Sequence, residues 1–145
     1  MHIETQIDHE KAIRTHRVTG LVTLQEFNSL LSVIYNSAEI DPKMPSFWDV
    51  READFTAVTP QDIRAFAEFV RVNWVEKSMN RAAIVVTGLS DFAVSRMYEQ
   101  VLGPATAGKV MVFWHPKSAM DWLEGKAKVS NPPMPPAGTS SKPPH

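Results

Sequence analysis

The chain contains no cysteine. This absence excludes disulfide bonds, thiolate metal ligands and cysteine nucleophiles. No stretch approaches the roughly 18 consecutive apolar residues that a membrane-spanning helix needs, so we expect no membrane span. Residues 1–8 contain acids and lack an apolar segment, so they do not read as a signal peptide. Together these absences predict a cytoplasmic location.

Motifs for catalysis or metal binding are also missing. The sequence has no Gly-x-Ser-x-Gly nucleophile elbow. His2, His9 and His16 stand seven residues apart, a spacing that puts strand residues on opposite faces, so we interpret them as surface or turn residues. Residues 103–109 match the glycine and lysine spacing of a phosphate-binding loop, but Val110 replaces the magnesium-binding hydroxyl residue and a helix precedes the segment. We therefore expect no enzyme activity, no metal and no cofactor.

Charge of one sign is not in large excess. The 145 residues carry 15 basic and 16 acidic side chains, for a net charge of −1. Three lysines and no acid fall within the last 20 residues, so the remainder of the chain is more acidic than the whole. An acidic domain repels phosphate backbones, and nucleic acid is not an expected partner.

The clearest positive signal is a strand pattern that recurs three times. Apolar runs at residues 47–50, 82–86 and 110–114 are each followed by a turn and a helical pattern. Such runs are typical of strands covered on both faces, and their alternation with helices predicts parallel pairing. Alternating residues at 2–8 and 12–18 predict an opening antiparallel hairpin. The predicted fold is α/β: one mixed sheet of about five strands with about four helices packed on it.

Local signals place the helix ends. Thr23, with Glu26 three residues later, predicts the start of a first helix through a capping box. Thr59 followed by proline predicts a second start, and Ser90 or Asp91 a third. Glycine and proline at residues 103–104 are expected to stop that third helix.

The end of the chain differs in composition from the rest. A short helix is predicted around residues 119–123. Six of the 11 prolines then fall within residues 131–145, together with serine, threonine and glycine. Such a segment buries too little apolar surface to offset its ordering entropy. We expect one domain over residues 1–125 and a proline-rich disordered tail over 126–145.

The predicted topology brings three loops to one edge of the sheet. Residues 51–59, which include a loop over 53–58, together with residues 87–91 and 115–117, follow the carboxyl ends of the parallel strands, where ligands of such sheets gather. Each loop opens a helix, and helix N-termini attract anions. Plain helix capping without a ligand remains the alternative. The candidate partner or ligand surface comprises Asp49, Arg51, Phe55, Thr56, Thr59, Phe69, Ser90 and His115.

Two features near this edge have open interpretations. Asp49 lies in a predicted buried strand, where a carboxylate is expected to cap nearby backbone or to pair with Arg51 rather than to act in catalysis. The aromatic residues form either plain core or the wall of an apolar cleft between helix and sheet. They are Phe47, Phe55, Phe66, Phe69, Trp74 and Phe92.

Several of these segments, taken together, resemble a known protein family. Residues 20–26, 47–55, 81–86, 92–98 and 112–123 resemble, in order and in local motif, the SpoIIAA-like group of STAS-type proteins. The resemblance spans about residues 12–124. It implies a sheet with one antiparallel edge, helices packed against it, and a regulatory or binding role instead of catalysis.

The resemblance also implies a candidate modification site. In members similar to anti-sigma factor antagonists, a serine in an Asp-Ser-Ser-Gly-like turn at the second helix start is phosphorylated to release a protein partner. This chain reads Ala57-Val58-Thr59-Pro60 there and lacks the glycine. Val58 or Thr59 falls at the acceptor position, which makes Thr59 the candidate phospho-acceptor.

The leading hypothesis is a non-enzymatic binding module with a protein partner. The expected surface comprises Phe55, Thr56 and Thr59 and the exposed side of the next helix, where Phe69 and Val72 lie off the core stripe. The alternative is carriage of an apolar, lipid-like small molecule between helix and sheet, because SpoIIAA-like proteins also resemble CRAL-TRIO folds. An uncovered edge at the opening hairpin further predicts a homodimer.

Overall fold

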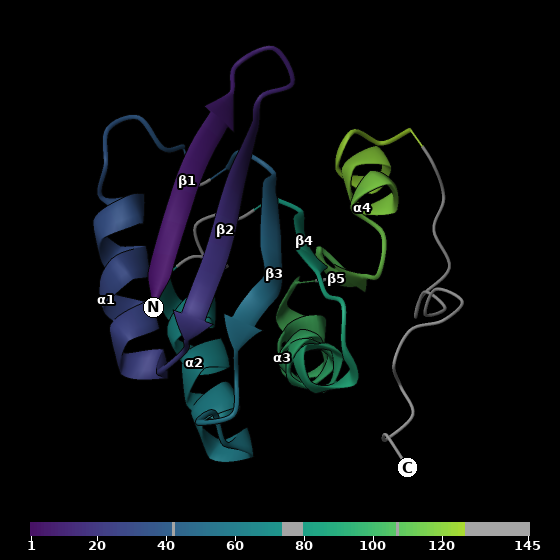
Figure 1. The fold of residues 1–145 in the computed structure, drawn as a ribbon. Coiled ribbons are helices and arrows are strands. Elements are labelled where there is room, and N and C mark those ends of the chain that lie inside the picture. The colour runs from purple at the N-terminus through teal and green to yellow at the C-terminus, as the bar shows by residue number, and fades with distance from the viewer. Residues whose placement is uncertain (42, 74–79, 107, 127–145) are drawn as a thin grey trace.

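Figure 1 shows the computed structural model of the chain, which describes residues 1–41, 43–73, 80–106 and 108–126. A single sheet stands at the centre, and helices lie on both of its faces. The strands are β1 (His2–Asp8), β2 (Ile13–Leu21), β3 (Ser46–Asp54), β4 (Ala82–Val85) and β5 (Val110–Phe113). The helices are α1 (Leu24–Tyr35), α2 (Pro60–Asn73), α3 (Leu89–Thr106) and α4 (Pro116–Leu123).

The strand order is β1-β2-β3-β4-β5. β1 and β2 pair antiparallel, and every later neighbour pairs parallel. The predicted mixed sheet with a leading hairpin is therefore confirmed. In register, Trp48 is the partner of Ile84, and Ile84 is the partner of Val112. These central residues of the three apolar runs form one row across the sheet, so the loops after them leave at the same edge.

Helices α1, α2 and α3 lie on one face of the sheet because each connects parallel neighbours in the same direction, and such crossovers are right-handed. Their apolar sides pack on Val18, Val50, Ile84 and Val112. α4 packs on the opposite face, where Phe47, Val85 and Phe113 point. Alternation along the strands thus builds two cores from one sheet.

Two element ends differ from the sequence prediction. β3 continues to Asp54, whereas we expected a loop from residue 53, because β3 pairs with β2 as far as Leu21 opposite Asp54. α3 continues to Thr106 and does not stop at residues 103–104, so Pro104 lies inside the helix. Proline there has no N–H for the Gln100 carbonyl and its ring crowds that carbonyl, and the helix ends two residues later.

The helix caps follow the predicted chemistry with one shift. Thr23 Oγ1 accepts from the Glu26 amide at 3.4 Å. Thr59 and Asp62 cap each other, since each backbone amide donates to the other side chain at 3.0 and 3.1 Å. α3 begins at Leu89, so the predicted cap at Ser90 or Asp91 is wrong: Asp91 lies in the first turn, and its carboxylate accepts from the amides of residues 87 and 88 at 3.0 and 2.9 Å. Ser90 is an exposed residue of the first turn.

A buried acid covers the outer edge of β5. Glu99 of α3 is 6% exposed, and its carboxylate accepts from the Val112 backbone amide at 3.1 Å. Burial raises the pKa of Glu99, and the ion pair with Arg96 opposes that rise. The carboxylate supplies a partner for an edge-strand amide that has no neighbouring strand.

At the other side of the sheet, β1 is the opposite edge strand, as the homodimer prediction requires, and that prediction stays open. Trp74 and the predicted tail from residue 127 onward lie outside the described residues. Within the described ranges, no helix is long and apolar enough to span a membrane.

Candidate functional site

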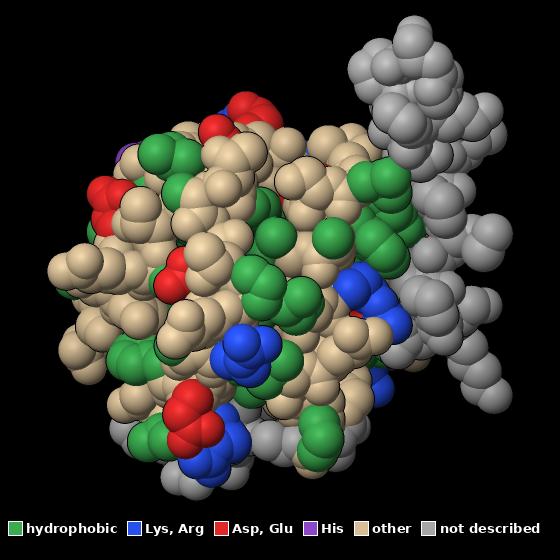
Figure 2. Space-filling view, turned by 90° about the horizontal axis from the view of Figure 1, so that it is seen from below, with side chains coloured by type: hydrophobic (Ala, Val, Ile, Leu, Met, Phe, Trp, Pro, Cys, Tyr) green, Lys and Arg blue, Asp and Glu red, His purple; other side chains and the backbone are tan. Residues whose placement is uncertain are grey.

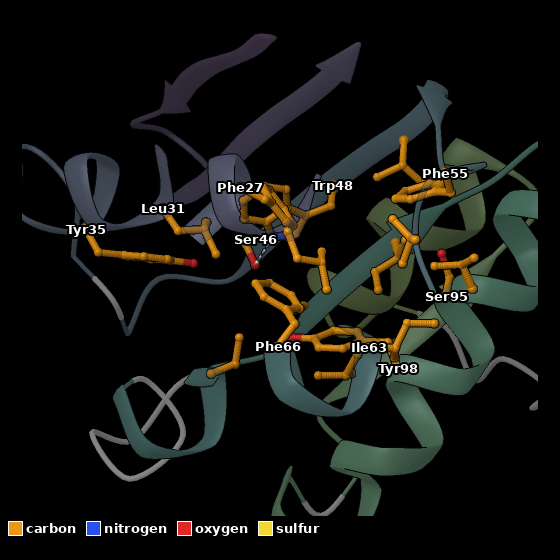
Figure 3. A pocket seen from close by; sticks show the side chains of 18 residues that line it. Phe27, Leu31, Tyr35, Ser46, Trp48, Phe55, Ile63, Phe66, Ser95 and Tyr98 are labelled. Atoms are coloured by element: carbon orange, nitrogen blue, oxygen red, sulfur yellow. Dashed lines mark hydrogen bonds between the residues drawn. The ribbon is translucent and has the colours of Figure 1, made fainter. Parts of the chain in front are cut away.

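A cavity of about 100 Å³ lies between the sheet and helices α1, α2 and α3. Figure 3 shows side chains from β3 and from all three helices converging on it. The row of the sheet that contains Trp48 and Ile84 forms its floor. Leu31, Phe66 and Tyr98 enclose it from the helices. The cavity is smaller than the roughly 150 Å³ engineered cavity that binds benzene, so it suits a molecule of about one aromatic ring.

Aromatic rings make up much of the wall. Phe27 and Phe66 stack with their centroids 5.0 Å apart, and Phe27 meets Trp48 edge-on at 5.9 Å. Tyr98 follows at 5.3 Å from Phe66. Offset and edge-on pairs of this kind hold rings in fixed positions. Of the aromatic residues left open by the sequence, Phe55 and Phe66 line the cavity, whereas Phe47 belongs to the core under α4.

A buried polar cluster adjoins one end of the cavity. Arg14 is 1% exposed and His16 is fully buried. Arg14 Nη1 lies 3.1 Å from His16 Nε2 and donates to the Tyr35 hydroxyl at 2.7 Å. Arg14 Nε donates to the Met44 carbonyl at 3.4 Å, and the guanidinium lies 4.5 Å from the centroid of the Tyr35 ring. These contacts join β2 to the end of α1.

The contacts of His16 fix its tautomer. An arginine only donates, so His16 Nε2 accepts and the ring proton sits on Nδ1, which lies 2.8 Å from Thr5 Oγ1. Burial, and then the charge of Arg14, lower the pKa of His16 to about 3. The imidazole is therefore neutral at pH 7, and it stacks on Trp48 at 4.0 Å.

The carboxyl ends of the parallel strands form a rim beside the cavity. Figure 2 looks onto this end of the molecule and shows hydrophobic side chains grouped near its middle, with isolated acidic and basic side chains around them. Leu21 and Leu89 are exposed here at 50% and 43%. Phe55 and Val58 are half-buried and line the cavity from the same end.

The predicted surface residues do not all meet at this rim. Asp49 and Arg51 lie on the opposite face of the sheet from Trp48 and Val50. They form the expected pair, with Arg51 Nε and Nη2 each donating to the Asp49 carboxylate at 2.9 Å. These hydrogen bonds and the Arg51 amide hold the pKa of Asp49 low against the effect of burial.

The other predicted residues are spread along the rim and the helices. Thr56 is exposed, and its amide donates to the Asp54 carboxylate at 2.9 Å. Thr59 and Ser90 are exposed at the starts of α2 and α3, and His115 is exposed at the start of α4 without a side-chain capping bond. Phe69 is half-buried against the core, while Val72 is 46% exposed.

Sequence reasoning missed the polar cluster. It predicted that the histidines are surface or turn residues, which is wrong for His16. Arg14 and Tyr35 belong to no recognisable sequence motif. Strand alternation puts Arg14 and His16 on the same face as Val18, and that face was the signal that could have revealed their burial.

Comparison with known proteins supports the fold. No protein-family model and no curated protein sequence matches the chain. A solved structure of an uncharacterized DUF3478-family protein from Shewanella loihica PV-4, described as having a SpoIIAA-like fold, aligns with a TM-score of 0.52 and 19% identity, over 84% of this chain and 92% of that one. The chain has a SpoIIAA-like fold. At this identity the likeness extends to the architecture alone.

Within the SpoIIAA-like fold, Thr59 is accessible but carries a neighbour unsuited to a phosphate. The Asp62 carboxylate accepts the Thr59 amide at 3.0 Å, so a phosphate on Thr59 would face a like charge. Phosphorylation of Thr59 stays a prediction. In the described ranges, no three His, Cys, Asp or Glu side chains gather in a way that could hold a metal ion.

Proposed function

We propose that this protein is a non-catalytic binding module that holds a small apolar molecule between its sheet and helices α1, α2 and α3. The observation that carries the proposal is the cavity, which is lined mainly by Leu, Ile, Val and Phe side chains and has few polar groups. Preformed, largely apolar cavities with a small number of polar groups are the usual form of small-molecule sites. The rim at Phe55 and Val58 gives such a molecule its entrance.

Benzene and toluene are suitable probes because each has the single ring that a cavity of about 100 Å³ can hold. We expect methyl NMR signals of Leu31 and Ile84 to shift on titration, while those of Ile13 and Leu123 on the opposite face stay unchanged. Ile84→Phe should fill the cavity and weaken probe binding at least tenfold. Val85→Ile is the matched control, since residue 85 points toward α4 and should not affect binding.

Equal shifts on both faces would indicate nonspecific association and contradict the proposal. The absence of any shift with either probe would contradict it as well. Native mass spectrometry of protein purified from its own host adds an independent readout, because a carrier is expected to retain its ligand.

A second candidate function is binding of a protein partner at the rim. Leu21 and Leu89 are exposed apolar side chains at the rim, and such side chains favour a partner surface. Leu21 is the register partner of Asp54, the residue directly before Phe55, so Leu21 and Phe55 lie at the same end of the sheet. We expect a partner captured from native extract by the wild type to be lost with the double variant Leu21→Ser and Leu89→Ser.

Val33→Ser is the matched control for this experiment, because Val33 is 71% exposed on α1. It should leave capture intact. Equal capture by the wild type, the double variant and Val33→Ser would argue against a partner surface at the rim. The absence of capture by all three would argue against it as well.

A further inference from the structure

Arg14, beside the cavity, is buried without a counter-charge from any described residue. Across residues 1–41, 43–73, 80–106 and 108–126, no carboxylate forms a salt bridge with Arg14. The bonds to Tyr35, His16 and Met44 satisfy donors but bring no negative charge. A buried ion without a partner of opposite charge costs several kcal/mol, so buried charges are normally paired.

The neighbours of Arg14 cannot supply that charge by ionising. His16 is neutral in its accepting form, as its contacts with Arg14 and Thr5 require. Burial raises the pKa of Tyr35, although Arg14 opposes the rise, so the phenol keeps its proton at pH 7. The cluster therefore carries one net positive charge next to an apolar cavity.

Hydroxyl groups link this charge to the cavity. Figure 3 shows the Tyr35 and Ser46 hydroxyls facing one another at one end of the cavity, and the Tyr98 hydroxyl entering from α3. Ser46 Oγ accepts from Trp48 Nε1 at 3.1 Å and retains its own proton as a donor. The Tyr98 hydroxyl forms no hydrogen bond with any described residue, so it is available to donate to a molecule in the cavity.

We propose that the molecule held in the cavity is a small carboxylic acid with an aromatic or short aliphatic body. Its carboxylate accepts hydrogen bonds from Ser46 and Tyr98 and balances the charge of Arg14, while its apolar part packs against Phe27, Phe66 and Trp48. This inference rests on the proposed binding function and adds the chemical class of the ligand. The cavity volume of about 100 Å³ limits that ligand to about one ring or a short chain.

The experiment compares an acid with its neutral isostere at pH 7. We expect benzoate to bind the wild-type protein at least tenfold more tightly than benzamide, measured by calorimetry or methyl NMR. Arg14→Met should remove this preference for benzoate, while its affinity for benzamide stays within twofold of the wild-type value. Tyr98→Phe should weaken benzoate severalfold without lowering the melting temperature, because its hydroxyl bonds no described residue. Hexanoate, run beside benzoate, distinguishes an aliphatic from an aromatic body.

Arg17→Met is the matched control, because Arg17 is an exposed strand residue that pairs with Glu52. It should leave the ratio of benzoate to benzamide affinity unchanged. Equal binding of benzoate and benzamide to the wild type would overturn the carboxylate inference and leave the apolar-ligand function standing. Failure of benzoate, benzamide, benzene and toluene alike would overturn both. If Arg14→Met does not fold, Tyr98→Phe and Ser46→Ala replace it in the experiment. A ratio of benzoate to benzamide affinity that is unchanged in both variants would overturn the carboxylate inference.

Discussion

Acidification from pH 7 to pH 5 should cost this protein about 2 kcal/mol of unfolding free energy through His16 alone. Burial and the charge of Arg14 hold the pKa of His16 at about 3 in the folded state, against about 6.5 for an exposed histidine. At a pH between these two pKa values, His16 is protonated in the unfolded chain and neutral in the folded chain. Stability therefore falls as the pH drops below 6.5, and the loss continues toward pH 3.

Urea unfolding at pH 7 and pH 5 measures this effect. His16→Gln should lower stability at pH 7, because it replaces a ring that stacks on Trp48, yet it should remove about 2 kcal/mol from the pH dependence. His9→Gln is the matched control, since His9 is exposed in the hairpin turn and should leave the pH dependence as in the wild type.

An equal loss between pH 7 and pH 5 in wild type and His16→Gln would refute the lowered pKa of His16. NMR titration of the ring gives a second, independent measurement. A His16 signal that titrates near pH 6.5 in the folded protein would contradict the buried neutral imidazole.

Trp122→Ala should cost about 3–5 kcal/mol, the largest loss we expect from any of these substitutions. α4 covers one face of the sheet, and Trp122 packs there against Phe113 with centroids 5.5 Å apart. Arg81 Nη1 donates to the Trp122 carbonyl at 2.6 Å, and its guanidinium lies 5.1 Å from the centroid of the indole. Truncation removes the ring contacts and opens a void over β4 and β5.

Thermal and urea unfolding provide the measurement, and Lys117→Ala is the control on the same helix. Lys117 is exposed and forms a surface pair with Asp121, so its loss should stay within about 0.5 kcal/mol. The cavity proposed to hold the ligand lies on the other face, so Trp122→Ala that remains folded should keep the expected benzoate affinity. A loss below 1 kcal/mol would show that α4 contributes little to the fold.

Most of the architecture was predictable because its signals are local. The caps at Thr23 and Thr59 depend on residues three positions apart, and apolar runs at 47–50, 82–86 and 110–114 need no distant information. Errors arose where a distant strand decided the outcome. β3 is longer than predicted because β2 continues to pair with it, and the local sequence at residues 53–54 does not indicate this pairing.

The candidate site was less predictable for the same reason. Arg14, His16 and Tyr35 are ordinary surface residue types, and separations of up to 21 residues divide them. Their burial required the hairpin to place Thr5 opposite His16 and the parallel register to place Trp48 beside it. Asp49 shows the converse, because its pairing with Arg51 two residues away was predicted correctly.

The order of strands and helices, the parallel direction and the positions of most helix starts were fixed by the chain itself, since hydrophobic period and capping act over a few residues. Only the tertiary structure decided that an arginine and a neutral histidine lie under α1, beside a cavity lined by aromatic rings. Burial and pKa depend on what the whole fold brings within a few ångströms, and that proximity is set by the packing of distant segments.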